Sequence, residues 1–238
     1  MLTPIARAAR ARAARIRGSL LTSIGDVAFG MEDGAVSVAG LVFGVAASTN
    51  DSQVVLLAGA TGAIAGAVSM MAGTYLDVTS ESSRATALVE GVRREIAADP
   101  AAALLRVGER LRTAGFTEVE AAGATAAFGR NPDALLDYVA AFELGVPRDA
   151  GAEPWTHAAW MFVADLIAAS IPVIPFALFD IETARIVSLI LTGALMAALG
   201  IARGLIGHEP VYRTALQTMA IAGVAALAGV LIGRLVTR

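Results

Sequence analysis

Long stretches without charged side chains limit the folds open to this chain more than any other feature. Residues 53–76, QVVLLAGATGAIAGAVSMMAGTYL, contain no acidic or basic residue. A helix needs about 20 mostly apolar residues to cross a bilayer. Further apolar stretches lie at 34–47 (extending back towards Ala28), 158–179, 186–202 and 214–233. The chain is 56% hydrophobic and 16% charged, whereas a soluble domain has about 25% charged residues. We therefore predict an all-α integral membrane protein with five transmembrane helices.

The segment between the second and third spans, residues 80–150, is rich in both acidic residues and arginine. It is typical of soluble helices, expected at 81–97, 100–114, from Thr117, and at 133–144. Asp99-Pro100 is a helix start, since Asp caps and Pro suits the first helical position. Thr117 and Glu120 have the spacing of a capping box. The sequence predicts transmembrane helices 1–2 within 26–79, a cytoplasmic helical insert at 80–150, and helices 3–5 within 151–238.

The N-terminal segment, residues 1–25, is basic and has no acidic residue. We expect a cytoplasmic amphipathic helix lying on anionic lipid headgroups; a transit peptide is the alternative. Five spans place the termini on opposite sides of the membrane, so the C-terminus is expected outside. A prokaryotic plasma membrane is the expected location. The basic residues are Arg7, Arg10, Arg12, Arg15 and Arg17.

Three acids lie at the start of the first span: Asp26, Glu32 and Asp33. A carboxylate at membrane depth is costly and therefore indicates function, whereas one in the headgroup region costs little. We favour function for Asp33, which directly precedes the apolar stretch, and leave both interpretations open for Asp26 and Glu32. Glycines four residues apart in each of the first two spans predict close helix packing. These pairs are Gly40 with Gly44 and Gly62 with Gly66.

Several motifs together resemble one family of membrane proteins. Asp33-Gly34 in the first span is followed by GAIAGAVSMMAGTYLDVTSES across the second, by FELGV at 142–146, and by IPVIPF at 171–176. In this order they resemble the vacuolar iron transporter (Ccc1-like) family. The resemblance implies a homodimer that exports Fe²⁺, and often Mn²⁺, from the cytosol in exchange for protons.

The resemblance also implies site residues. The family's intramembrane acid falls on Asp33, an earlier acid on Asp26, and the methionine of a Ser-Met motif on Met70. Carboxylate oxygen with thioether sulfur suits a transition metal better than Mg²⁺ or Ca²⁺. Without the resemblance, Met70 would be interpreted as packing.

This chain departs from the family pattern at several positions. Gly62 stands where the family usually has a glutamate. Of seven insert positions that carry ligands in the family, only Glu95 and Glu143 keep a possible metal ligand. We expect that the insert has lost its multi-metal site. A different site built from Glu109, Glu118, Glu120 and Asp137 is an alternative. The seven insert positions, on an ungapped alignment, are Val92, Glu95, Ala103, Arg106, Val139, Ala140 and Glu143.

Asp165 stands in the third span, where relatives more often carry an uncharged residue. We hypothesise that it replaces the carboxylate missing at Gly62 or carries protons. His157 and His208 lie at membrane boundaries, where packing is favoured over metal binding. Glu81 either lines the cytoplasmic entrance with Asp26 or is a solvated helix residue.

The function expected is proton-coupled export of Fe²⁺ or Mn²⁺ as transported substrates, without a tightly bound cofactor. The alternatives are a family-like membrane protein that no longer transports, acting as a sensor or interaction platform, and transport of another substrate. The sequence contains neither a phosphate-binding loop nor a nucleophile–base pair, so an enzyme is not expected. The basic cluster adjoins the membrane, so nucleic-acid binding is not expected. The chain has no cysteine, which excludes disulfides and thiolate metal ligands.

Overall fold

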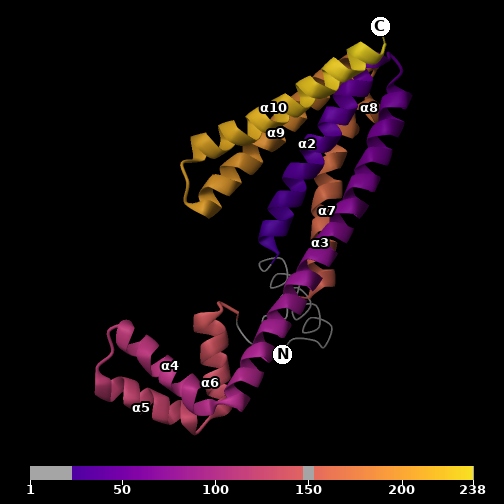
Figure 1. Ribbon diagram of the computed structural model, residues 1–238. Coiled ribbons are helices and arrows are strands. Elements are labelled where there is room, and N and C mark those ends of the chain that lie inside the picture. The colour runs from indigo at the N-terminus through magenta and orange to yellow at the C-terminus, as the bar shows by residue number, and fades with distance from the viewer. Residues whose placement is uncertain (1–22, 147–152, 238) are drawn as a thin grey trace, which may run out of the picture. The chain divides into compact units, whose positions relative to one another are not determined.

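The structure is a computed structural model that describes residues 23–146 and 153–237, and every regular element in these ranges is a helix (Figure 1). A helix was expected at residues 1–25, and residues 1–22 of this segment lie outside the described residues. The elements are α2 (Ile24–Ser48), α3 (Ser52–Ala98), α4 (Pro100–Thr113), α5 (Glu118–Gly129), α6 (Pro132–Tyr138), the π-helix η1 (Val139–Glu143), α7 (Pro154–Val173), α8 (Pro175–Leu178), α9 (Ile181–Gly207) and α10 (Val211–Val236).

The chain divides into two compact units. The first, the membrane unit, contains the residues up to Leu76 and from Pro154 onward, and the second, the insert unit, contains Asp77–Glu153. Five helices, α2, α3, α7, α9 and α10, are long and apolar enough to cross a membrane. Each of the five expected spans overlaps one of them, which confirms the number of spans, although the third span, 158–179, extends past the end of α7 into α8 (Pro175–Leu178).

Helix α3 differs from the prediction, because the second span and the first helix of the insert form one uninterrupted helix, Ser52–Ala98. The polar residues after Leu76 suggested an ending, but they do not end the helix. Thr86, for example, donates its hydroxyl to the carbonyl of Ser82 at 2.9 Å, which is the bond by which a helical Thr is satisfied within its own helix. No proline interrupts the segment before Pro100.

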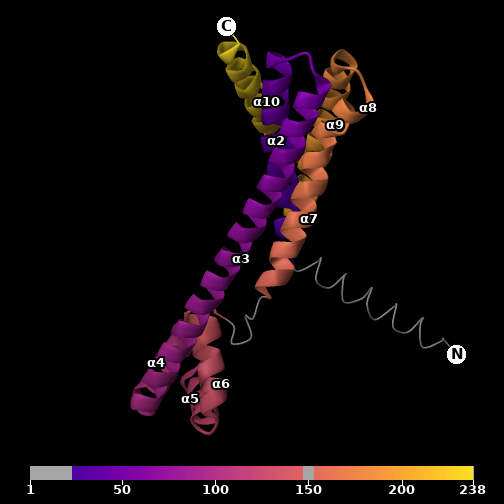
Figure 2. The same cartoon turned by 90° about the vertical axis from the view of Figure 1, so that its right-hand side faces the viewer.

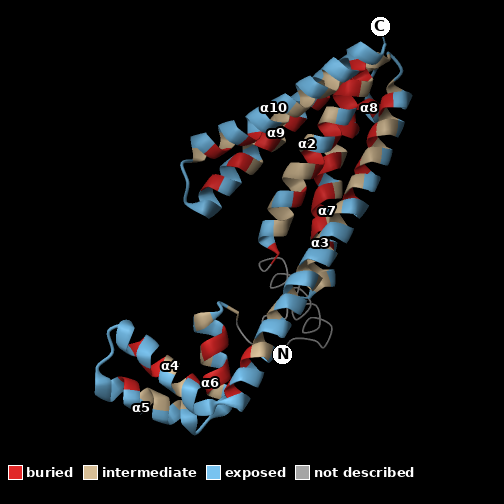
Figure 3. Ribbon diagram, in the orientation of Figure 1, coloured by how far each residue is buried: buried red, intermediate tan, exposed pale blue. Residues whose placement is uncertain are grey.

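Helix α2 is the centre of the membrane unit. It packs against α7, α9 and α10, and the portion of α3 in this unit runs alongside α7 in both views (Figures 1 and 2). Val42 of α2, Val55 of α3 and Val173 of α7 belong to one buried cluster. Buried residues concentrate on α2 and α7, whereas much of α10 is exposed (Figure 3). An exposed apolar surface of this kind suits contact with lipid.

The close packing expected from Gly40 and Gly44 has α10 as its partner. A Cβ placed on Gly44 would lie 2.8 Å from the carbonyl oxygen of Gly229, and one placed on Gly229 or Gly233 would clash with the carbonyl oxygen of Gly40 or Gly44. Two glycine pairs four residues apart therefore face each other, and the helix backbones are in contact.

We expect Gly229→Ala to destabilise the membrane unit by about 1–3 kcal/mol, the usual range for overpacking, because the obstructing atoms are backbone and cannot rotate away. Gly223→Ala on the same helix is the matched control, since nothing lies within 4 Å of a Cβ there. Thermal unfolding of the full chain in detergent measures both variants. Equal unfolding temperatures would contradict the α2–α10 contact.

The third span is interrupted near its prolines: α7 finishes at Val173, and the short helix α8 begins at Pro175. The last carbonyls of a helix have no partner within that helix, and side-chain donors from neighbouring helices can satisfy them. Here the buried hydroxyl of Ser188 on α9 donates to the carbonyl of Pro172 at 2.7 Å. Arg185 similarly donates to the carbonyls of Ala46 and Thr49 at the end of α2. Residues of α9 therefore secure the ends of α7 and α2.

The insert unit confirms the helix starts expected from sequence. Asp99 Oδ1 accepts a hydrogen bond from the Ala102 amide at 2.9 Å, and Thr117 with Glu120 forms a capping box at α5. Gly115 follows α4 with φ of 101°, a conformation that favours glycine. A buried cluster joins α3, α4, α5, α6 and η1, so this unit has a core of its own.

Candidate metal-transport site

Two carboxylates of the membrane unit lie close together, on α2 and α7. Asp33 is half-buried on α2, whereas Asp165 on α7 is only 2% exposed. Asp33 directly precedes Gly34, the residue of α2 against which Asp165 lies. Asp165 lies against Gly34, where an added Cβ would be 2.7 Å from its Oδ1. The glycine thus makes room for a carboxylate that would otherwise not fit between the helices.

Asp165 makes no hydrogen bond or ion pair with any of the described residues, although it is buried. Its Oδ2 lies 3.9 Å from the position of a Cβ on Gly66 of α3, so α2 and α3 both approach it. Met70 follows Gly66 by four residues and therefore shares its face of α3; its side chain is half-buried. Asp33, Asp165 and Met70 thus lie on three helices, α2, α7 and α3, that meet near Asp165.

A second methionine, Met161, is part of this arrangement, and the sequence reasoning missed it. Its Sδ lies 2.7 Å from the position of a Cβ on Gly30, and the residue is 3% exposed. Met161 precedes Asp165 by one turn, just as Gly30 precedes Gly34 on α2. This matching of two spacings was visible in the sequence, but only if α2 and α7 were known to be neighbours.

The position of the missing family glutamate, Gly62, is filled by a helix contact. A Cβ on Gly62 would clash with Cδ2 of Leu41 on α2. Gly62 therefore faces the Leu41 side chain of α2, and it supplies no carboxylate.

The other two acids of the first span have basic side chains as partners. Asp26 Oδ2 lies 2.5 Å from Nδ1 of His157 on α7, and Glu32 Oε2 lies 3.4 Å from Nη1 of Arg203 on α9. Both pairs join α2 to another helix near its beginning. The role of Asp26 at the entrance stays a prediction, and the structure adds a partner, His157, for which only packing was expected.

Two further candidates lie apart from these carboxylates. His208 is exposed and follows α9 in the left-handed conformation, with φ of 54°. Its observed part is to end that helix. Glu81 is exposed on the portion of α3 in the insert unit.

Three of the insert positions for which the resemblance implied metal ligands, Glu95, Arg106 and Glu143, come together around the arginine. Arg106 forms ion pairs with Glu95 and, at 3.3 Å, with Glu143. The hydrogen bond to Glu95 is the largest cause that raises the pKa of the Arg106 guanidinium above its usual value. The remaining four positions, Val92, Ala103, Val139 and Ala140, are buried. A guanidinium between two carboxylates and an apolar core therefore occupy the positions at which the resemblance implied a metal site.

This arrangement predicts that a divalent cation site can be restored by one substitution. Arg106→Glu would leave three neighbouring carboxylates, which repel one another unless a cation lies among them. We expect faster hydrogen exchange in α4–α6 of the full chain without metal and recovery with Ca²⁺. Wild type and Arg106→Met should not respond to Ca²⁺. A response of the wild type to Ca²⁺ would contradict the loss of the insert's metal site.

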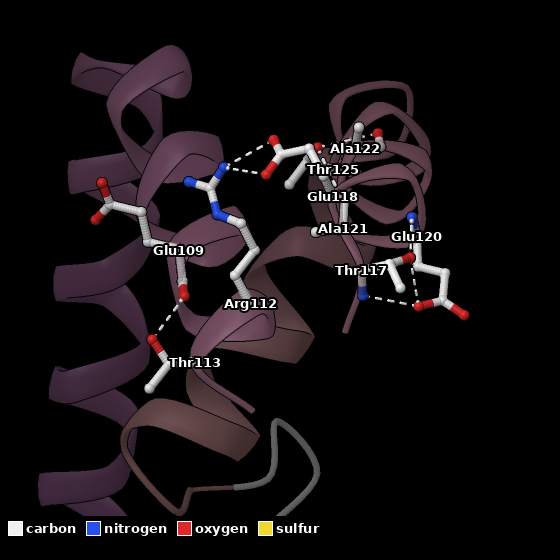
Figure 4. A network of polar contacts seen from close by, with 9 residues as sticks. All are labelled: Glu109, Arg112, Thr113, Thr117, Glu118, Glu120, Ala121, Ala122 and Thr125. Carbon is white, nitrogen blue, oxygen red and sulfur yellow. Dashed lines mark hydrogen bonds and ion pairs between the residues drawn. The ribbon is translucent and has the colours of Figure 1, made fainter. Parts of the chain in front are cut away.

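The alternative acidic site in the insert is not formed. Arg112 binds both carboxylate oxygens of Glu118, at 2.8 and 3.0 Å, and the carboxylate of Glu120 accepts hydrogen bonds from Thr117 (Figure 4). Within the described residues, no three His, Cys, Asp or Glu side chains gather closely enough to hold a metal ion. The alternative site of Glu109, Glu118, Glu120 and Asp137 is therefore not seen in the described residues, and two of its carboxylates bind other residues.

The capping box also predicts a local response to pH. Hydrogen bonds from the hydroxyl and amide of Thr117 lower the pKa of Glu120. A depressed folded-state pKa stabilises the fold above the unfolded value, about 4.3, and this stabilisation is lost as pH falls through the folded value. We expect protection of α5 amides against exchange, corrected for intrinsic rates, to decline below about pH 4.3. Glu120→Gln should lack this contribution, whereas Glu109→Gln, outside the capping box, should keep it.

Comparison with known proteins gives a consistent result over most of the chain. A sequence model of the VIT family matches residues 24–234. Vacuolar iron transporter 1 of Arabidopsis thaliana is 29% identical over 213 residues, 89% of this chain and 85% of that protein. Vacuolar iron transporter 1 of Oryza sativa subsp. japonica is 30% identical over 207 residues, 85% of this chain and 81% of that protein.

These relatives are transporters by name and not enzymes, and this chain is not an enzyme. Their names refer to the vacuole, so they lend no support to the prokaryotic plasma membrane expected from sequence. The resemblance noted from Asp33, the second span and the insert is confirmed, since the family match includes all of them. The chain is an integral membrane protein that belongs to the VIT family.

Proposed function

We propose that this protein transports divalent transition metal ions, Fe²⁺ or Mn²⁺ or both, out of the cytosol in exchange for protons. The main observation behind the proposal is the pair of carboxylates, Asp33 and Asp165, on adjacent membrane-spanning helices. Met70 is one helical turn from Gly66, a residue of α3 that lies near Asp165. The names of the relatives, iron transporters, support the choice of substrate.

The chemistry of a carboxylate links the two fluxes. An ionised carboxylate binds a cation, and the protonated form releases it, so one group that meets water alternately on two sides exchanges a metal ion for protons. Asp33 is placed for this role because it is half-buried on the central helix. Thioether sulfur adds preference for transition metals over Mg²⁺ and Ca²⁺.

Asp165 also bears on the alternative that the chain no longer transports. The altered insert, with Arg106 between two glutamates, favours a sensor or interaction platform. A buried aspartate in a membrane helix is costly, however, and without a function it would be a liability. Asp165 therefore favours retained transport of a cation.

The expected topology places the N-terminus and the insert in the cytosol and the C-terminus outside. We further propose a homodimer in lipid, in line with the resemblance; the exposed apolar faces of the bundle suit either lipid or a second copy. Cross-linking in the membrane and protease protection of tagged termini test these two statements.

Transport is tested with the full chain in proteoliposomes. Fe²⁺ and Mn²⁺ are offered separately, with and without an imposed proton gradient, and entry is followed with a metal-sensitive dye. We expect metal flux that rises with the gradient, accompanied by opposite proton movement. Absence of flux for both ions, from folded protein, would favour the non-transporting alternative or another substrate.

A further inference from the structure

Met161 and Asp165 form a short row on α7 that fits a matching row of glycines on α2. Both side chains are nearly fully buried, at 3% and 2% exposure. The sulfur lies against Gly30 and the carboxylate against Gly34. Since residues four apart share one helix face, a thioether and a carboxylate are presented together to the segment of α2 that carries Asp33.

The unpartnered state of Asp165 points to a bound cation. A buried carboxylate is normally paired or hydrogen-bonded, yet Asp165 has no such partner among the described residues. The two basic side chains seen near the beginning of α2 contact other acids: His157 contacts Asp26, and Arg203 pairs with Glu32. Asp33 adds a second negative charge beside Asp165. A positive ion is therefore what the arrangement lacks.

The methionine distinguishes which cation fits. Packing alone is the usual role of a buried methionine, and Met196 on α9 illustrates it: that residue is fully buried in an apolar cluster with Ala35 and Ala168. Met161 differs because it is one turn from an unpaired carboxylate. Two carboxylates with a thioether favour a transition metal ion over Mg²⁺ or Ca²⁺.

We propose that Met161 and Asp165 of α7 supply one half of the metal-binding site, opposite Asp33 of α2, and that Met161 sets the preference for transition metals. This inference rests on the proposed transport of divalent metals. It assigns to α7 two ligands that the sequence reasoning either missed or left as accessory.

The absence of cysteine from the chain permits a direct test. In Met161→Cys, Co²⁺ bound at position 161 would produce a cobalt–thiolate charge-transfer absorption that the wild type cannot show. Met196→Cys is the matched control, because it places the same thiol at another buried methionine. The double variant Met161→Cys with Asp165→Asn should lose the band. These spectra use the full chain in detergent and do not depend on transport.

A second variant covers the case in which cysteine disturbs folding. Met161→Leu conserves volume, and we expect it to weaken Co²⁺ binding relative to Mn²⁺ by about tenfold, the lower end of the loss seen when support of a metal site is removed. Met196→Leu should leave this ratio unchanged. Equal ratios for the wild type and Met161→Leu would overturn the proposal.

The spectra test the metal site on α7, and the flux assay tests the transport function, so the two proposals can fail separately. A band at position 161 without any flux would support the site and contradict the transport function. Flux in the wild type, with no band in folded Met161→Cys, would retain the transport function and overturn the role of Met161. A band of equal strength in Met196→Cys would also overturn it, because the ion would then not be specific to α7.

Discussion

Replacing Asp33 with asparagine is expected to reduce proton-driven Fe²⁺ and Mn²⁺ flux to the level of protein-free liposomes. The change keeps the size of the side chain but removes its charge, and an amide neither attracts a divalent cation strongly nor exchanges a proton. Asp33 is the half-buried carboxylate of α2 beside the buried Asp165. Its loss would leave one carboxylate for an ion that carries two charges.

The neighbouring acid is the matched control for this prediction. Glu32→Gln alters a carboxylate one residue away that pairs with Arg203 on α9, and we expect most of the flux to remain. Asp33→Glu, which keeps the charge on a longer side chain, should retain measurable flux. Full flux in Asp33→Asn, with folding verified by size-exclusion chromatography, would contradict the proposal that the Asp33 carboxylate binds the transported ion.

The spans and helix starts were predictable because they depend on local sequence. Charge-free stretches long enough to cross a bilayer fell on α2, α3, α7, α9 and α10. The capping residues Asp99 and Thr117 act on amides of their own first turn, so no knowledge of the tertiary structure was required. The continuity of α3 was missed because polar residues after Leu76 were interpreted as an ending.

The partners of charged residues were not predictable in the same way. Asp26 and His157 are 131 residues apart in sequence, and Glu32 and Arg203 are 171 apart. Their pairing depends on which helices are neighbours, and spans alone do not determine that. In the insert, the substitution of Arg106 suggested a lost metal site. Only the structure brings Arg106 between Glu95 and Glu143.

Glycine spacing was informative only in part. The pair Gly40 and Gly44 correctly indicated close packing, but its partner on α10, Gly229 with Gly233, was not identified. Gly30 and Gly34 have the same spacing on α2 and face α7 at Met161 and Asp165. One helix thus carries two glycine pairs, one for packing and one beside the carboxylates.

Gly34→Ala is expected to have the second largest effect, on both stability and transport. The new methyl group would lie 2.5 Å from the carbonyl oxygen of Asp165 and 2.7 Å from its Oδ1. The carbonyl belongs to the backbone of α7, so the helices must separate, at a cost of about 1–3 kcal/mol. The carboxylate must also move, and we expect metal flux to fall further than stability alone explains.

Gly193→Ala in the middle of α9 is the control, because nothing lies within 4 Å of a Cβ at that position. Alanine is favoured over glycine in a helix by about 1 kcal/mol, so this variant should be at least as stable as the wild type and transport normally. The measurements are thermal unfolding in detergent and flux in proteoliposomes at equal protein content. Gly34→Ala could lower the unfolding temperature and leave flux per folded protein unchanged. Asp165 would then be a packing residue, and metal transport would depend on Asp33 but not on Asp165.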